Sequence, residues 1–431
     1  MGIGNGRRVA VVGGCRTPFA KAGTLFRDVG AADLARVAVR ELLCRTEVDP
    51  ASVEQVVFGQ VIPSVLAPNV AREVSLLPQF PRTVPAHTVN RACASSSQAI
   101  AEAHDQIALG QADVVIAGGT ESLSNVPVLH SRRFSGLLVE AAKARGLGAR
   151  LRVLARVRPR DLVPVTPAIA EPSTGLTMGQ SAEKMARENG ISREAQDRYA
   201  LRSHRLAAQG TADGRLTAEI VPVFVAPGYD AVVSDNGIRG DSDMGQLAKL
   251  RPAFDRRYGS VTAGNSSPLT DGAAAVLLTS ERAARAQGCA PLAYIRSYAV
   301  AAVDPAGQLL MGPAYAIPRA LDRAGIEWKD LGVVEMHEAF AAQMLSNVQA
   351  LESREWATER LGRSGPVGDV NWDIVNVMGG SIAIGHPFGA TGARITTTLA
   401  NEMRRRRAEF GLLSLCAQGG MGFAMVLESA P

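Results

Sequence analysis

The spacing of apolar residues along the chain alternates between two periods, and this alternation predicts a layered α/β core. Short apolar runs predict strands at 8–12, 56–61, 112–119 and 273–278. Apolar residues at helical spacing fill 33–44 and 93–110, between such runs. The run at 112–119 is apolar throughout, which is typical of a strand covered on both faces. The first 121 residues therefore form one α/β half, and residues 270–290 return to it.

The last third of the chain repeats this rhythm. Strands are predicted at 293–300, 333–336, 411–415 and 423–427, and helices at 315–324, from 338 onward, and at 395–407. Residues 291–431 are therefore expected to form a second, similar half, although no residue-level repeat relates the two. Between them, residues 122–269 break into helices and loops rich in Arg, Pro and Gly, including a helix at 192–209 capped by Ser192. We expect this stretch to be an inserted loop domain.

Composition narrows the class of protein. The chain has 431 residues, of which 46% are hydrophobic and 20% charged, as in an ordinary globular protein of two or three domains. A net charge of +5 comes with no zinc-finger spacing or RNA-binding motif, so we expect no nucleic acid, although a basic surface suits a phosphate-bearing substrate. Five scattered cysteines without a CxxC pair indicate a reducing compartment. Without a leader pattern or a run of eighteen apolar residues, we expect a cytoplasmic protein.

Cys93 opens the helical segment 93–110 and is followed by small residues. A thiol at a helix N-terminus lies where the helix dipole favours the thiolate, so Cys93 is a candidate nucleophile. A buried structural cysteine beside a tightly packed helix explains the same pattern. This stretch alone leaves both interpretations open.

Three further polar residues, His337, His386 and Cys416, follow predicted strands, and open α/β sheets place active sites at strand ends. His386 precedes a proline and has glycines around it, which favours a catalytic base with room for a substrate over a core histidine. Cys416 taken alone is typical of a small core residue. None of these residues has a partner at the close spacing of structural zinc sites, so we expect no metal.

Six segments together resemble the motif set of the thiolases, in order and over nearly the whole chain: VNRACASSS, GGTESLS, GNSSPLTDGAAA, HEAF, GGSIAIGHPFGATGAR and CAQGGMG. HEAF in place of the commoner NEAF, together with DNGIR and LAKLRPAF, is similar to the trifunctional-protein β-subunits, which are 3-ketoacyl-CoA thiolases of fatty-acid β-oxidation. The resemblance implies an α/β thiolase fold, with two similar βαβαβαββ halves in a layered α/β/α/β/α arrangement and an inserted loop domain. It also implies cleavage of 3-ketoacyl-CoA by free CoA to acetyl-CoA and a shortened acyl-CoA.

The resemblance further implies a role for each polar residue. Cys93 becomes acylated, His386 takes its proton, and Cys416 protonates the departing enolate of acetyl-CoA or removes a proton in the condensing direction. His386 and a group held by His337 serve one thioester oxygen, and the backbone N–H groups of Cys93 and Gln418 serve the other. The family usually has glycine at position 418, so the change alters the shape of the pocket and keeps the backbone donor.

Coenzyme A is implied as a substrate, with no tightly bound cofactor. By resemblance Arg239 lies near its nucleotide and Ser267 near its pantetheine. Three further residues lie along the acyl or pantetheine tunnel: Met178, Phe254 and Phe340. Ordinary packing or hydration is the alternative at each of these five positions. Thr177 stands where many acetoacetyl-specific members carry a histidine, which argues against a dedicated short-chain enzyme.

Other functions remain to be compared with this one. An acetyl-CoA C-acetyltransferase working in the condensing direction is the main alternative. A non-catalytic lipid- or CoA-binding relative is disfavoured by the joint presence of Cys93, His337, His386 and Cys416. A ketoacyl synthase on the same fold usually pairs one cysteine with two histidines, so Cys416 favours a thiolase. The family is generally dimeric or tetrameric, so a homodimer or homotetramer is expected.

Residues 132–164 hold nine basic residues against two acidic ones, with apolar residues at largely helical spacing. A basic amphipathic helix is typical of a membrane surface or a partner contact, and a solvated lid is the alternative. Trifunctional-type β-subunits resemble the chain here too, using the region to dock a hydratase/dehydrogenase α-subunit and to approach membranes. We therefore expect an α-subunit contact or peripheral membrane contact through 132–164.

Overall fold

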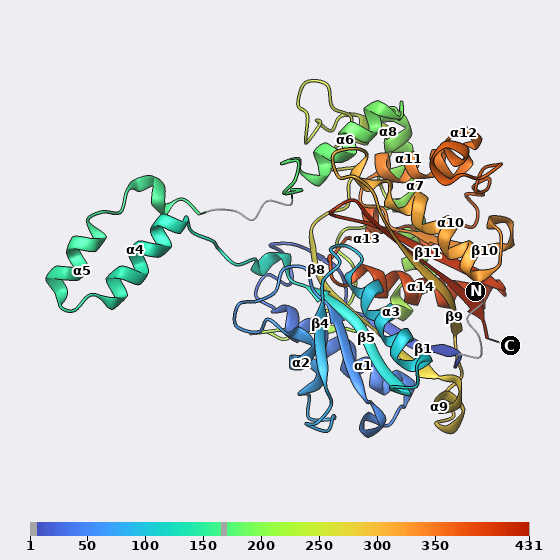
Figure 1. The fold of residues 1–431 in the computed structure, drawn as a ribbon, viewed down its shortest axis with the longest axis horizontal. Coiled ribbons are helices and arrows are strands. Elements are labelled where there is room, and N and C mark those ends of the chain that lie inside the picture. Colours follow the sequence, from blue (N-terminus) through green and yellow to red (C-terminus); the bar gives the residue numbers. More distant parts are fainter. Residues whose placement is uncertain (1–6, 165–169, 431) are drawn as a thin grey trace. The chain divides into compact units, whose positions relative to one another are not determined.

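The structure is a computed structural model that describes residues 7–164 and 170–430 (Figure 1). It divides into a main unit, Met1–Asn125 with Glu171–Pro431, and a small unit, Val126–Ala170. Only the first part of the predicted insert, 122–269, is thus separate by its contacts, and the rest packs with the main unit. The predicted boundaries of 1–121, 122–269 and 291–431 stay predictions.

The N-terminal half has the βαβαβαββ order that the resemblance implied. Its elements are β1 (Val9–Arg16), α1 (Ala31–Thr46), β3 (Gln55–Gly59), α2 (Val70–Ser75), β4 (Ala86–Val89), α3 (Ser95–Ala108), β5 (Val114–Glu121) and β8 (Thr270–Ser280). The strands lie in the order β4-β3-β5-β8-β1, with β8 antiparallel to both neighbours. The short strand β2 (Ala20–Lys21) pairs with β8, and α9 (Glu281–Ala286) follows β8. The run predicted at 112–119 is β5, which is buried along its whole length.

The C-terminal half departs from this order at its third strand. It contains β9 (Ala293–Ala302), α10 (Gly312–Ala324), β10 (Leu331–Met336), α11 (Ala341–Glu352), α12 (Arg354–Trp356), α13 (Ser381–Ile384), α14 (Thr391–Arg406), β11 (Phe410–Ala417) and β12 (Met421–Ser429). The third strand is reduced to a parallel bridge between Val334 and Val375. The helix predicted from 338 begins only at Ala341, because Phe340 is still extended at its N-cap.

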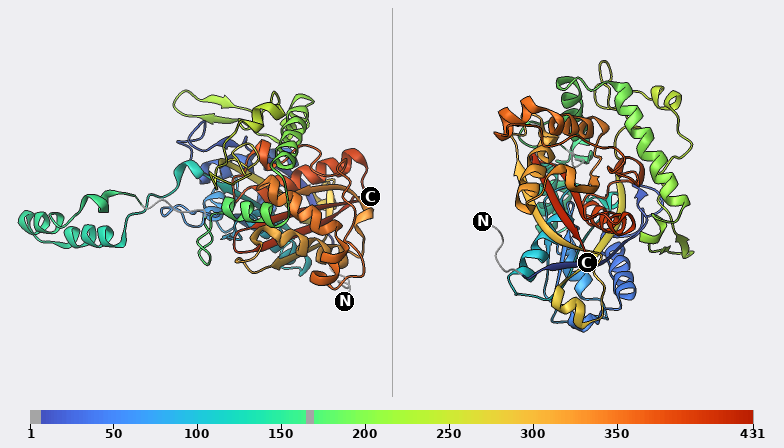
Figure 2. Two further views of the ribbon diagram at one scale, coloured as in Figure 1. Left: turned by 90° about the horizontal axis from the view of Figure 1, so that it is seen from above. Right: turned by 90° about the vertical axis from the view of Figure 1, so that its right-hand side faces the viewer.

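The two sheet halves and their helices make five layers, and the strands lie between helices in the further views of the molecule (Figure 2). One apolar core joins α3 and α14 to the inner faces of both halves of the sheet. A second core lies between α1, α2 and the outer face of the N-terminal half, and a third between α10, α11 and the C-terminal half. The layered α/β/α/β/α prediction is therefore confirmed. Among the described residues, the two halves of the sheet join edge to edge through two residue pairs, Ala10 with Tyr294 and Val11 with Ala293.

The part of the insert that packs on the main unit contains α6 (Met178–Glu188), α7 (Arg193–Ala212), β6 (Val223–Val225), β7 (Asp230–Val232) and α8 (Met244–Ala248). The predicted cap of α7 is present, because the Ser192 hydroxyl accepts from the Ala195 N–H at 3.1 Å. Helix α7 is tied to the C-terminal half by Tyr199 and Ser203, which both donate to the buried carboxylate of Glu338.

The small unit is a pair of helices, α4 (Arg132–Lys143) and α5 (Leu147–Leu154). Its apolar residues form two sets rather than one face. Leu137, Ala141 and Val153 are buried between the helices. Leu138, Leu151 and Leu154 are exposed by 42–57%. Within the described residues, no helix of the chain combines the length and the hydropathy needed to cross a membrane.

Candidate active site

Cys93 lies in a tight turn between β4 and α3. Ala92 has a φ of +45°, which an L-residue rarely adopts, and α3 itself starts two residues after the cysteine, at Ser95. The first turn of α3 meets the first turn of α14, where a Cβ on Gly392 would come within 2.2 Å of the Ser97 hydroxyl. The small residues after the cysteine therefore let two helix N-termini meet beside it.

The structure brings Cys93 together with two histidines from the other half of the chain. The Cys93 sulfur and one ring nitrogen each of His337 and His386 lie within 4.8 Å of one another. The two imidazole rings have centroids 4.1 Å apart. A sulfur and two nitrogens this close can pass a proton between them, and they can also hold a soft metal ion such as zinc.

Each histidine is held through its Nδ1 atom by a neighbouring hydroxyl. His386 Nδ1 lies 2.7 Å from Thr391 Oγ1, and His337 Nδ1 lies 2.9 Å from Ser381 Oγ. The two Nε2 atoms are buried and have no hydrogen-bond partner among the described residues. Burial lowers the pKa of His386 to about 3 and that of His337 well below its ordinary value, and the charge of Arg394 adds to both shifts. Both rings are therefore neutral at physiological pH, with their free nitrogens available to the site.

The expectation that the helix N-terminus makes Cys93 favour its thiolate is wrong. Burial raises the pKa of the Cys93 thiol to about 12, although hydrogen bonds from the backbone N–H groups of Gln418 and of Cys93 itself lower it. The helix dipole is too weak to reverse this effect, because α3 begins beyond the cysteine and the sulfur lies in a desolvated site. A neutral thiol beside a neutral imidazole must transfer its proton to become a nucleophile.

Cys416 lies near the end of β11, and Gln418 lies in the turn that follows, between β11 and β12. Cys416 is buried, and burial raises the pKa of its thiol well above the ordinary value, with the nearby Cys93 sulfur adding to the shift. The Gln418 backbone N–H points at the Cys93 sulfur. Glu171 fixes the turn, because its carboxylate accepts from the Gly419 N–H at 3.1 Å. The second cysteine and a second backbone donor therefore lie beside the first cysteine.

All three predicted tunnel residues share one apolar cluster with Cys416. Phe340 is buried in it, and Met178 and Phe254 pack against it from the insert. The rings of Phe254 and Phe340 meet edge to face with centroids 5.9 Å apart. These residues therefore form an apolar wall next to the second cysteine.

The two other predicted CoA positions lie on loops around the histidines. Ser267 is half-buried, and its N–H donates to Ala339 O at 2.9 Å, two residues after His337. Arg239 is exposed, and its backbone N–H donates to His204 Nδ1 at 3.2 Å. The loop before Arg239 packs closely against the main chain of Ala383, just ahead of His386. Both residues are thus near the site without entering the Cys93–histidine group.

Sequence reasoning missed the residues that hold the site in place. Ser381, Thr391 and Arg394 contact the histidines or lie behind them, and all three are buried. The buried carboxylate of Glu121 accepts N–H groups from Val61, Ile62 and Gly389, and burial raises its pKa to about 7. The only sign of such a residue in the sequence is a polar side chain within a glycine-rich segment, at a position where a small apolar residue would pack equally well. That sign was not recognised.

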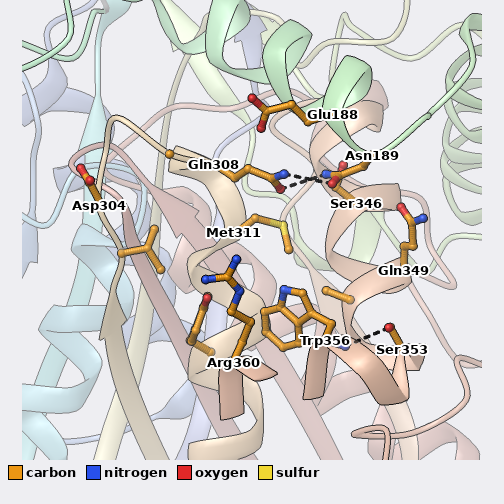
Figure 3. Close-up of a pocket in the computed structure, with 14 residues that line it drawn as sticks. Glu188, Asn189, Asp304, Gln308, Met311, Ser346, Gln349, Ser353, Trp356 and Arg360 are labelled. Atoms are coloured by element: carbon orange, nitrogen blue, oxygen red, sulfur yellow. Dashed lines mark hydrogen bonds between the residues drawn. The ribbon is translucent and has the colours of Figure 1, made fainter. Parts of the chain in front are cut away.

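Another cavity of about 520 Å³ lies next to this site, between α6, α11 and the segment before α10 (Figure 3). Asn189 and Gln308 exchange two hydrogen bonds across it, at 2.9 and 3.0 Å. Trp356 and Arg360 line its other side. The cavity borders the Cys416 cluster, because Met311 and Ala350 belong to both and Tyr315 and Trp356 pack against the cluster. None of the predicted site residues lines this cavity.

Comparison with known proteins identifies the family of the chain. Two family models match, "Thiolase, N-terminal domain" over residues 9–282 and "Thiolase, C-terminal domain" over 289–429. The 3-ketoacyl-CoA thiolases of Yersinia pestis (strain Pestoides F) and Yersinia pseudotuberculosis (strain YPIII) are 51% identical to it over 423 residues, which cover 98% of this chain and 97% of theirs.

Solved structures agree with these matches. The Bacillus anthracis acetyl-CoA acetyltransferase has a TM-score of 0.83 at 34% identity and covers 99% of both chains. The human mitochondrial 3-ketoacyl-CoA thiolase in complex with CoA has the same TM-score and identity and covers 98% of both chains.

Proposed function

The chain belongs to the thiolase family, and on that basis we propose that it cleaves 3-ketoacyl-CoA with free CoA to give acetyl-CoA and an acyl-CoA two carbons shorter. The observation that carries this proposal is the grouping of the Cys93 sulfur with two histidine nitrogens within 4.8 Å, next to Cys416. It supports an acyl-enzyme mechanism, because a nucleophile, a base and a second acid are all at hand.

In the first half of the reaction His386 Nε2 takes the thiol proton as the Cys93 sulfur adds to the 3-keto carbon. The bond between C2 and C3 then breaks, and its electron pair moves to C2 as the enolate of acetyl-CoA. Cys416 protonates C2, acetyl-CoA leaves, and Cys93 remains acylated. The backbone N–H groups of Cys93 and Gln418 donate to the oxygen of the attacked carbon. His386, together with His337 or a group held by it, donates to the enolate oxygen.

In the second half the sulfur of free CoA attacks the carbonyl carbon of the acyl group on Cys93. The Cys416 thiolate, left after the first half, takes the proton of the CoA thiol. The C–S bond to Cys93 breaks, and the Cys93 sulfur recovers its proton from His386. Both cysteines end as neutral thiols, which agrees with the raised pKa of each in its buried site.

Mass spectrometry of the intact protein tests this proposal. Mixing with a 3-ketoacyl-CoA in the absence of CoA should give one acyl adduct per chain, and adding CoA should remove it. A Cys93→Ala variant that forms the adduct in equal yield would overturn the assignment. Measuring kcat/KM over a series of chain lengths then separates a degradative 3-ketoacyl-CoA thiolase from an acetyl-CoA C-acetyltransferase, which accepts only the shortest substrate.

We propose CoA positions at Arg239, Ser267, Met178, Phe254 and Phe340. The apolar wall of Met178, Phe254 and Phe340 beside Cys416 suits an acyl or pantetheine chain, and the exposed Arg239 near the His386 loop suits a phosphate. Arg239→Gln should raise KM for CoA severalfold and leave kcat nearly unchanged. An equal fall in kcat and kcat/KM would place Arg239 outside the nucleotide site.

We also propose that residues 132–164 of the small unit contact an α-subunit or an anionic membrane, and that the chain is a homodimer or homotetramer. The exposed leucines at 138, 151 and 154 together with nine basic residues support a contact surface. Replacing Arg150, Arg152, Arg156 and Arg158 with Gln should weaken binding to anionic vesicles or to the α-subunit in a salt-dependent way. If the unmodified protein binds neither at low salt, this surface has no such role.

A further inference from the structure

Each histidine of the site contacts a hydroxyl group, and the two hydroxyl groups donate their protons to different kinds of acceptor. Thr391 Oγ1 donates its proton to Pro387 O at 3.0 Å, so it can only accept from His386 Nδ1. His386 therefore carries its proton on Nδ1, and its Nε2 lone pair is free to act as a base.

Ser381 presents the opposite case. Its oxygen accepts from Arg394 Nη2 at 3.1 Å, and the described residues offer its proton no acceptor other than His337 Nδ1. The hydroxyl therefore donates to His337 Nδ1, which satisfies both groups. His337 must then carry its proton on Nε2, the buried atom that has no partner among the described residues and lies in the site.

We propose that Ser381 is a positioning residue that holds His337 in the Nε2–H tautomer, so that His337 itself donates a hydrogen bond to the reacting oxygen while His386 in the opposite tautomer acts as the base. The family resemblance implies that a group held by His337 makes this donation. If the Nε2–H group of His337 donates directly to the reacting oxygen, no such intermediate group is needed.

Arg394 strengthens this arrangement from behind. It is fully buried and lies 3.6 Å from the carboxylate of Glu335, which is also buried. A cation that donates to the Ser381 oxygen polarises the hydroxyl and makes it a better donor to His337. Burial of the two rings, with the same charge as a lesser cause, lowers the pKa of both imidazoles and keeps them from taking up a second proton. The chain Glu335–Arg394–Ser381–His337 thus ends in one N–H group aimed into the site.

The catalytic consequence of the positioning role of Ser381 rests on the proposed thiolase function. The tautomer of His337 does not, because it can be measured without any turnover. The chain has six histidines, so a long-range ¹⁵N–¹H spectrum of protein labelled at histidine is simple to assign with single variants. We expect His337 protonated at Nε2 and His386 protonated at Nδ1. Ser381→Ala should convert the His337 signal into a mixture of tautomers and leave that of His386 unchanged. A His337 that is protonated at Nδ1 in the unmodified protein would refute the proposal.

A double-mutant cycle tests the catalytic consequence. Ser381→Ala should lower kcat/KM for a 3-ketoacyl-CoA by about ten- to a hundredfold, somewhat less than the roughly 10²–10³ for removing an oxyanion donor outright. With His337→Asn already present, Ser381→Ala should cost less than about threefold, because an asparagine has no tautomer to fix. An equal loss in both backgrounds would mean that Ser381 only supports the fold. Ser297→Ala, which removes another buried hydroxyl bonded to Ala320 O at 2.7 Å, is the control and should leave turnover unchanged.

The outcomes separate the two proposals. If the unmodified protein turns over no 3-ketoacyl-CoA, the proposed function fails while the tautomer spectrum still decides the role of Ser381. If turnover is present and the cycle shows no coupling, the role of Ser381 is refuted and the thiolase function stands. If His337→Asn has too little activity for the cycle, the tautomer of His337 in the spectrum supports or refutes the role of Ser381 by itself.

Discussion

Replacing Thr391 with valine removes the hydroxyl that accepts from His386 Nδ1 and keeps the shape of the side chain. The bond is 2.7 Å long and fully buried, so no water is at hand to replace it. The Nδ1–H would then face a methyl group, which costs about 1–3 kcal/mol for a buried unsatisfied donor. The imidazole can avoid this cost by moving its proton to Nε2, and in that form it has no lone pair to offer Cys93.

The size of the effect follows from this penalty. At roughly 1.4 kcal/mol per factor of ten, the fraction of His386 in the form that acts as a base should fall about five- to a hundredfold. The rate of acylation of Cys93 should fall by the same factor, because the thiol has a pKa near 12 and depends on that base for its deprotonation.

The assay is the rate of iodoacetamide labelling of Cys93 at pH 7.5, followed by peptide mass spectrometry, together with the rate of acyl-adduct formation. Thr396→Val is a matched control on the same helix, because its buried hydroxyl donates to Gly392 O at 2.8 Å and forms no hydrogen bond with a histidine among the described residues. Labelling of Cys93 in Thr391→Val at the rate of the unmodified protein would refute the role of His386 Nδ1–H. Equal slowing in Thr396→Val would show a general loosening of α14 instead.

Three further predictions concern separate parts of the molecule. Cys416→Ser should keep acylation of Cys93 by activated thioesters and lose carbon–carbon cleavage, and the opposite result in mass spectrometry and turnover would mean that the two roles are exchanged. Because the pKa values of His204 and His386 are lowered by burial to about 4 and about 3, the unfolded chain binds more protons below pH 6.5, so the free energy of unfolding should fall as the pH drops from 6.5 toward 3. Urea titrations at pH 7 and pH 5 check this, and equal stability at both would contradict it. Glu338→Gln replaces an acceptor of four donors and should lower the free energy of unfolding by at least about 1.5–3 kcal/mol in urea titrations, whereas the exposed control Glu409→Gln should change it by less than about 0.5 kcal/mol.

The elements of the two halves could be predicted from the sequence because their signals are local. The run at 112–119 and the helix at 192–209 are apparent from apolar spacing and a serine cap, and the structure has both within a few residues. The predicted start of the helix at 338 was wrong. Its first residues have apolar and polar side chains at helical spacing, but pairing with a distant segment of the chain holds their backbone extended. Ala341 N donates to Asn265 O, and Ser266 pairs with Phe340 in a bridge.

The site was predicted only in part for a related reason. Cys93, His337, His386 and Cys416 stand at strand or helix ends with glycines nearby, so their chemistry could be suspected one by one. Their meeting depends on contacts between residues hundreds of positions apart, which apolar spacing does not encode. The pKa of Cys93 shows the same limit, because the helix position predicted a thiolate while the burial that outweighs it exists only in the folded protein.

The narrow joint between the two halves has a consequence for protein engineering. The sheet crosses it through two residue pairs at β1 and β9, whereas the nucleophile and its base are brought into register by α3 and α14, through Gly392 against Ser97 and the Ala393 N–H on Ser96 Oγ at 2.9 Å. A chimera of two homologous parents with its crossover near residue 288 would rebuild the sheet from compatible edges. The nucleophile and the base of the chimera would be correctly placed only if the first turns of those two helices had matching small residues. Recombination libraries should therefore inherit residues 95–97 and 389–393 from the same parent.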